Sequence, residues 1–205
     1  MPDHLAQLEP LASYQPASNG ATGTVLVSDR PAVRIALPAL FVELAGPGMH
    51  VQSSRAAQLA SQVRRSISEN TGWGLYVIEL VDQAGGWPDP ESRLVVQAHV
   101  LYRVVLARLD IGLHTRQIGL EEAIATLSQR LPLEPSEARA AVRGILLEPT
   151  RACGVIAGRR ELLRLRDDRA AKEGPAFSAR RHHEEVLGFG GLPVPLTRWG
   201  LGLDA

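Results

Sequence analysis

Two pairs of residues in this chain place a carboxylate and an imidazole at helical spacing. Asp110 and His114 are four residues apart, and Glu43 and His50 are seven apart, so each pair can share one face of a helix. A carboxylate beside a histidine can fix its tautomer, raise its basicity or join it in binding a metal ion. Each pair also has a structural interpretation, as a hydrogen bond or an ion pair that closes a helix end. Both interpretations stay open from sequence alone.

The remaining titratable residues favour structural roles. His99 lies within an apolar helical segment, which is typical of a core or boundary histidine. His182 and His183 lie between two arginines and two glutamates, a charge run that predicts a solvent-exposed helix face. Cys153, the single cysteine, excludes an intramolecular disulfide and is expected to be buried and inert. No phosphate-binding loop, dinucleotide fingerprint or HExxH motif is present.

The composition excludes several classes of function. Lys and Arg total 22 and Asp and Glu total 22, so the chain lacks the basic surplus that binds nucleic acid or an anionic membrane. No apolar run reaches the roughly 18 residues that a membrane span needs. The first residues lack the charged and then apolar pattern of a signal peptide. We therefore expect a cytoplasmic protein with no nucleic-acid or membrane partner.

The pattern of apolar residues, prolines and glycines predicts a mainly α fold with one small hairpin. Residues 1–38 form an irregular N-terminal arm, in which segments 24–27 and 32–37 are expected to pair as strands. Pro38 is expected to start the first helix, and residues 39–205 to form one compact helical unit. Helical periodicity marks residues 53–69, 72–84, 89–110, 119–130, 135–148, 150–172 and 177–188, followed by an irregular tail at 190–195.

Several strings occur in an order that resembles a known family. They are Tyr14-Gln15-Pro16 with Gly20, Leu37-Pro38, Pro47-Gly48-Met49-His50-Val51-Gln52, Gly72-Trp73-Gly74-Leu75-Tyr76, Asp110-Ile111-Gly112-Leu113-His114, Pro149 and Gly158. Together they resemble the C-terminal half of the bacterial "domain of unknown function 885" family, over about residues 12–197. That family is regarded as one of long, mostly helical, zinc-dependent hydrolases, so the resemblance implies a zincin-like helical domain.

The chain departs from the family's strings at the positions that would carry zinc chemistry. Glu43-Leu44 replaces the family's His-Glu, and Met49 replaces the first histidine of a His-His pair, which leaves only His50. Thr71 replaces the glutamate before Gly72-Trp73, and Val155-Ile156 replaces a Tyr-Lys pair. A zincin needs about three protein ligands and an activated water. We therefore expect no bound metal, no other cofactor and no zinc peptidase activity.

If the family's fold is kept, the resemblance implies that the polar residues that remain line its cleft. These residues are His50, Tyr76, Glu79, Asp110 and His114. The favoured hypothesis is a metal-free acid–base catalyst for a small apolar molecule, through cyclisation or isomerisation in specialised metabolism. His114 or His50 would transfer the proton, Asp110 would orient the histidine, and Tyr76 or Glu79 would assist. The side chains expected to contact the substrate are Glu43, Met49, Trp73 and Val155.

Two alternatives to that hypothesis remain. The chain could be a non-catalytic pseudo-enzyme that binds a ligand or a partner protein, or Glu43, His50 and Glu79 could form an unorthodox metal site. Because the resemblance is to the C-terminal half of a longer family, the helices would lack their usual cover. We therefore expect a homo-oligomer, or a partner chain that supplies the missing N-terminal half.

Overall fold

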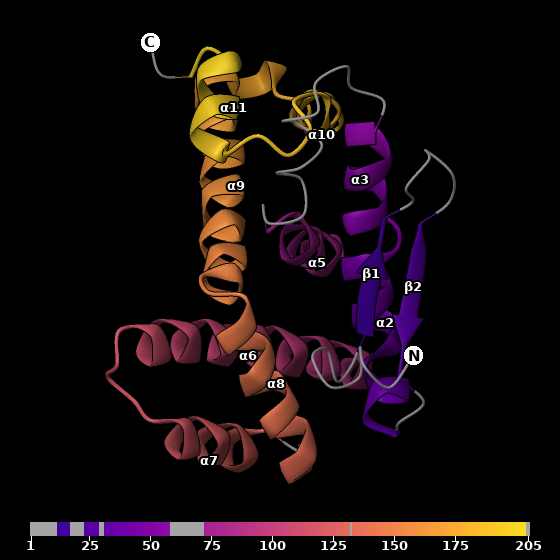
Figure 1. The fold of residues 1–205 in the computed structure, drawn as a ribbon. Helices are drawn as coiled ribbons and strands as arrows, with labels where there is room; N and C mark the ends of the chain where they lie inside the picture. The colour runs from indigo at the N-terminus through magenta and orange to yellow at the C-terminus, as the bar shows by residue number, and fades with distance from the viewer. Residues whose placement is uncertain (1–11, 17–22, 29–30, 58–71, 132, 204–205) are drawn as a thin grey trace.

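The computed structural model describes residues 12–16, 23–28, 31–57, 72–131 and 133–203, and these are mainly helical (Figure 1). Strands β1 (Ala12–Gln15) and β2 (Thr24–Val27) form an antiparallel hairpin with Ala12 opposite Val27. The helices are α2 (Pro31–Leu44), α3 (Met49–Ala57), α5 (Trp73–Gln83), α6 (Pro90–His114), α7 (Leu120–Arg130), α8 (Pro135–Leu147), α9 (Arg151–Glu173), α10 (Ala179–Gly188) and α11 (Val194–Gly200). The predicted fold class, mainly α with a small N-terminal hairpin, is confirmed.

The hairpin pairs a different segment from the one expected. β2 matches the predicted strand at 24–27, but its partner is β1, and the predicted strand at 32–37 is wrong. That segment is the first half of α2, in which Pro31 takes the first position and Pro38 lies inside the helix. Contacts of α2 with α5, α6 and β1 decide the outcome over the weak strand preference of the segment. The expected boundary at residue 38 therefore falls within one continuous helix.

Most of the predicted helices form near their expected bounds. Asp89 caps α6 as expected, because its Oδ1 accepts a hydrogen bond of 2.7 Å from the backbone N–H of Ser92. α6 continues to His114, four residues beyond the expected end. The helix expected at 53–69 is described only as far as Ala57, within α3, and the rest of it lies outside the described residues. α11 lies partly in the tail expected to be irregular and was not predicted.

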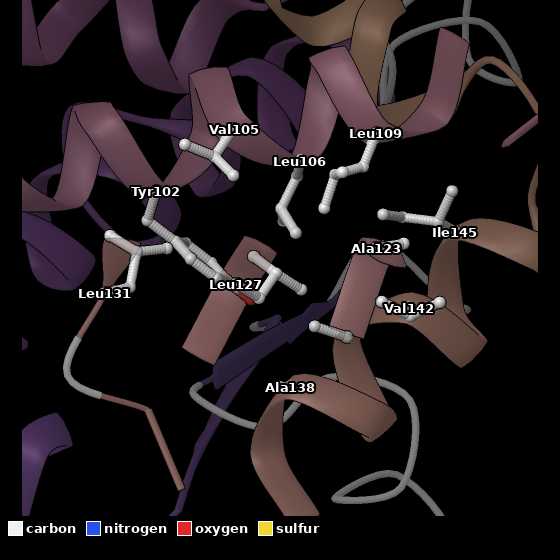
Figure 2. Packing of buried hydrophobic residues seen from close by; sticks show 11 residues of the cluster. Tyr102, Val105, Leu106, Leu109, Ala123, Leu127, Leu131, Ala138, Val142 and Ile145 are labelled. Carbon is white, nitrogen blue, oxygen red and sulfur yellow. The ribbon is translucent and has the colours of Figure 1, made fainter. Parts of the chain in front are cut away.

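Helix α6 is the central element of the fold. It contacts α2, α5, α7, α8 and α9, and Figure 1 shows α7 and α8 on one side of it and α5 on the other. In Figure 2, Leu106 and Leu109 of α6 point toward side chains of α7 and α8, including Leu127 and Val142, which are fully buried. A second apolar cluster surrounds Trp73 and joins α5 to α9, α10 and α11.

Gly72 lets the start of α5 press directly against the backbone of α9. Its φ is 74°, a left-handed conformation that favours glycine. A Cβ at this position would overlap the backbone N of Arg159 and the carbonyl oxygen of Val155. The start of α5 therefore meets α9 through a contact between backbones, in addition to the side-chain packing of the two helices.

Candidate functional site

Glu43 forms a buried ion-pair network that ties α2 to α6. Its Oε2 accepts a hydrogen bond of 2.5 Å from His99 Nε2, and its Oε1 lies 2.9 Å from Arg103 Nη2. Burial would raise the pKa of Glu43, but Arg103 and His99 outweigh that effect and lower the pKa to about 2. His99 is buried and hydrogen-bonded, as the sequence predicted. Glu43 lies inside the fold, in contact with these two side chains.

His50 contacts a tyrosine of the hairpin. α2 ends at Leu44 and α3 begins at Met49, so the Gly46-Pro47-Gly48 break places Glu43 and His50 on different helices. The Nδ1 of His50 lies 3.1 Å from the hydroxyl of Tyr14 on β1. Met49, beside His50, packs against the apolar cluster that contains Leu44.

Asp110 caps the start of α9. Its Oδ2 accepts a hydrogen bond from the backbone N–H of Cys153, and its Oδ1 accepts one from that of Thr150, both at 3.0 Å. Oδ1 also lies 2.9 Å from His114 Nδ1, so the predicted Asp110–His114 contact is formed. Burial would raise the pKa of Asp110, but the hydrogen bonds from Cys153 and Thr150 outweigh it and lower the pKa. Asp110 therefore has a structural role beyond its own helix, because its carboxylate accepts hydrogen bonds from two N–H groups at the start of α9.

Tyr76 and His183 join α5 to α10. The Tyr76 hydroxyl lies 2.8 Å from His183 Nε2, and Tyr76 is 1% exposed. Burial raises the pKa of Tyr76, so the phenol keeps its proton. Burial, and then the charge of Arg166, lowers the pKa of His183. The Nε1 of Trp73, which lies beside Tyr76, donates to the carbonyl oxygen of Pro47 at 3.0 Å.

The solvent-exposed face predicted for His182 and His183 is wrong. His182 is 1% exposed and His183 is half-buried, because the His183 ring packs against Trp73 and the His182 ring against Phe177 and His183. Arg180 and Glu184, on the outer face of α10, form the exposed ion pair. Burial, and then the neighbouring His183, lowers the pKa of His182 to about 4. The charges of the run lie outside, while its imidazoles lie inside.

The remaining candidate donors do not gather into a metal site. Glu79 forms an ion pair with Arg159 of α9. In the described part of the chain, no group of three or more His, Cys, Asp or Glu residues could hold a metal ion. Leu44, at the general-base position implied by the family resemblance, is buried among apolar side chains, and Thr71 lies outside the described residues. These residues do not fit a catalytic zinc, which needs three protein ligands and an open position.

Two adjoining hollows, which we call the Arg151 groove, lie beside the start of α9. Both have Glu148 and Arg151 in their walls, and these two side chains form an exposed ion pair. The first hollow, of about 230 Å³, lies between β1, α6, α8 and α9, and is lined by Ser13, Tyr102, Arg103, Leu106, Ala141, Gly144, Ile145, Leu147, Glu148, Arg151, Ala152 and Val155. The second, of about 380 Å³, is lined by Tyr14, Met49, Glu148, Pro149, Thr150, Arg151 and Gly154.

The groove brings together only some of the residues expected at a site. Val155 and Met49, both predicted to contact a substrate, line the first and the second hollow. The other predicted site residues, Glu43, His50, Trp73, Tyr76, Glu79, Asp110 and His114, are absent from both linings. Sequence reasoning missed both Arg103 and Arg151. Arg151 belongs to a run of arginines and acids that is typical of a surface helix. The Pro149–Thr150 break before that helix was the available indication of a hollow.

The chain belongs to the family described as "Bacterial protein of unknown function (DUF885)", whose model matches residues 1–199. Two solved structures of proteins described as "putative lipoproteins" are similar to it. The one from Colwellia psychrerythraea has a TM-score of 0.87 and 25% identity, and the alignment covers 100% of this chain and 37% of that one. The one from Shewanella oneidensis, of unknown function, has a TM-score of 0.75 and 22% identity, with 94% and 39% covered.

The chain thus spans less than two fifths of the length of these two similar structures. No curated protein matches the sequence. None of the described helices has the length and apolar character that a membrane crossing requires.

Replacing Asp110 with asparagine should destabilise the protein by about 1–3 kcal/mol, because the amide NH₂ cannot accept one of the two backbone hydrogen bonds. His114→Ala, the matched control, leaves both bonds in place and should cost less. Urea unfolding followed by circular dichroism measures both. A wild-type free energy of unfolding in Asp110→Asn would contradict the capping role.

Stability should fall as the pH drops from about 6.5 toward 4. In that range the unfolded chain binds a proton at His182, with an ordinary histidine pKa near 6.5, while the folded chain does not. Glu43 acts in a lower window, since its stabilising charge is lost only as the pH falls from 4.5 toward 2. Melting temperatures at pH 7, 5.5 and 4.5 should decline less steeply for His182→Gln than for the wild type. Equal slopes would exclude His182 as the cause.

Proposed function

We propose that this protein binds a small, largely apolar molecule with an acidic group in the Arg151 groove, and that it does not hydrolyse peptides with zinc. The observation that carries the proposal is the make-up of the first hollow. Its lining is mostly apolar, with residues such as Leu106, Ile145 and Val155, and it includes two arginines, Arg103 and Arg151. Ligand sites typically combine an apolar surface with a few placed polar groups.

The two arginines suit an anionic group for different reasons. Arg103 is held from behind by the buried carboxylate of Glu43 and therefore has a fixed place in the wall. Arg151 pairs with Glu148 at the surface, where such a pair contributes about 1 kcal/mol or less, so a ligand carboxylate can compete for it. Two N–H groups at the start of α9, those of Thr150 and Cys153, are already bound to Asp110 and cannot take this role.

Loss of zinc hydrolysis follows from the residues at the family's functional positions. Leu44 has no group that can take a proton from water, and its side chain is buried. Met49 carries a thioether in place of an imidazole and packs with Leu44. The polar side chains that remain nearby, such as Glu43, are engaged in contacts within the protein.

A second candidate function is metal-free acid–base catalysis on the same molecule, by isomerisation or cyclisation. The observation that favours it is the contact of Tyr14 with His50, because Tyr14 stands in the wall of the second hollow. A tyrosine hydroxyl bonded to an imidazole can pass a proton to or from a bound molecule. Catalytic roles for His114, Asp110, Tyr76 and Glu79, and a cytoplasmic location, stay predictions.

Filling the first hollow should weaken binding of 8-anilinonaphthalene-1-sulfonate, an apolar anion whose fluorescence reports its burial. We expect Ala152→Phe to raise the dissociation constant at least tenfold, because Ala152 lines the hollow. Ala170→Phe, at a half-buried alanine of the same helix outside both linings, is the control and should stay within twofold of the wild type. Arg151→Ala should weaken this anion more than the neutral N-phenyl-1-naphthylamine. Unchanged binding in Ala152→Phe would overturn the proposal.

The catalytic candidate predicts that the wild-type protein converts a molecule in a small-molecule extract, as followed by mass spectrometry. His50→Ala and Tyr14→Phe should both abolish that conversion, while binding of the fluorescent anion persists. Binding without any conversion by the wild type would leave the first proposal in place and remove the second.

A further inference from the structure

The outer face of α6 carries an apolar stripe that no described element covers. Its positions follow the spacing three, four, three, four, three, and they are Leu94, Gln97, Leu101, Val104, Arg108 and Ile111. All six side chains are exposed, with Leu94 at 71%, Leu101 at 50%, Val104 at 44% and Ile111 at 52%. The stripe runs for roughly 25 Å along the helix. This spacing is the a and d pattern of a helix that packs lengthwise against another helix.

The order of residues along the stripe is symmetric about its centre. Read from the two ends inward, Leu94 corresponds to Ile111, Gln97 to Arg108 and Leu101 to Val104. When two copies of this helix lie antiparallel about that centre, apolar residues face apolar residues, and the guanidinium of Arg108 meets the amide oxygen of Gln97. One turn further out, exposed Glu91 faces the partly exposed His114 of the second copy. In a parallel arrangement, Arg108 would face its own like charge.

We propose that α6 packs antiparallel against α6 of a second copy of this chain, with the twofold axis between Leu101 and Val104. A twofold contact requires that one patch be complementary to itself, and the arrangement of apolar and polar residues along this stripe meets that condition. Apolar residues at regular spacing and this exposed are typical of an interaction surface. The contact lies on the exposed side of α6, and none of the six stripe residues lines the Arg151 groove.

Sedimentation equilibrium of the 205-residue chain tests the contact. We expect a dimer at micromolar concentration, and Leu101→Glu should raise its dissociation constant at least tenfold while the melting curve stays cooperative. Leu196→Glu is the matched control, because Leu196 is equally exposed, on α11. A wild-type chain that is monomeric at 100 micromolar overturns the proposal and leaves the stripe to a helix of another protein or of a longer chain. A dimer that Leu101→Glu does not weaken overturns it as well.

The register has a separate test that uses charge. Gln97→Glu should tighten the antiparallel dimer about two- to tenfold, because it creates two charge pairs with Arg108. Gln97→Arg should weaken the dimer, and adding Arg108→Glu to it should restore wild-type affinity. In a parallel dimer Gln97→Glu would instead weaken association, because the two new charges would face each other. That outcome, or failure of the double variant to recover, contradicts the proposed register.

Discussion

The carboxylate of Asp110 fixes the place where α9 begins, and much of the molecule depends on that point. α6 and α9 are the two longest of the described helices and share the most extensive contact between elements, so their junction positions the helices that pack on either of them. The first N–H groups of a helix have no partner within it. Here a buried side chain from α6 supplies that partner, and the adjoining residues Glu148 and Arg151 are placed at the surface beside it. The groove is thus formed by the same junction that holds the helices together.

The sequence predicts structure well where the contacts are local. α5 and α6 are bounded by Gly85-Gly86 and by Asp89-Pro90, which act on neighbouring residues, and both helices form near their expected ends. The hairpin is different, because the partner of β2 is a four-residue strand whose pairing depends on tertiary contact. α2 contains alternating apolar residues and two prolines, and its contacts with α5, α6 and β1 favour the helical state over the strand. Helix and strand propensities depend on neighbouring residues in the sequence and carry no information on such tertiary contacts.

In the candidate site, too, the sequence predicts the local contacts and misses the long-range ones. The contact between Asp110 and His114 could be predicted, because four residues bring both side chains to one face of a helix. The bonds from Asp110 to the start of α9 could not, since they cross 40 or more positions of the chain. The network of Glu43, His99 and Arg103 joins residues 56 or more positions apart, and it assigns to Glu43 a role inside the fold. Burial of His182 was likewise hidden by its charged neighbours in sequence.

The close approach at Gly72 is a backbone contact, while the walls of the Arg151 groove are formed by side chains. Where two helices meet through side chains, each exchange of a residue shifts the distance between them. At Gly72, α5 meets α9 through backbone, so the approach at this one point does not depend on side-chain size, while further along the two helices pack through side chains such as Trp73 and Leu162. The carbonyl of Val155 belongs to this contact, while the side chain of Val155 lines the first hollow. A substitution that changes the lining of the groove at Val155 therefore leaves the backbone contact at Gly72 in place.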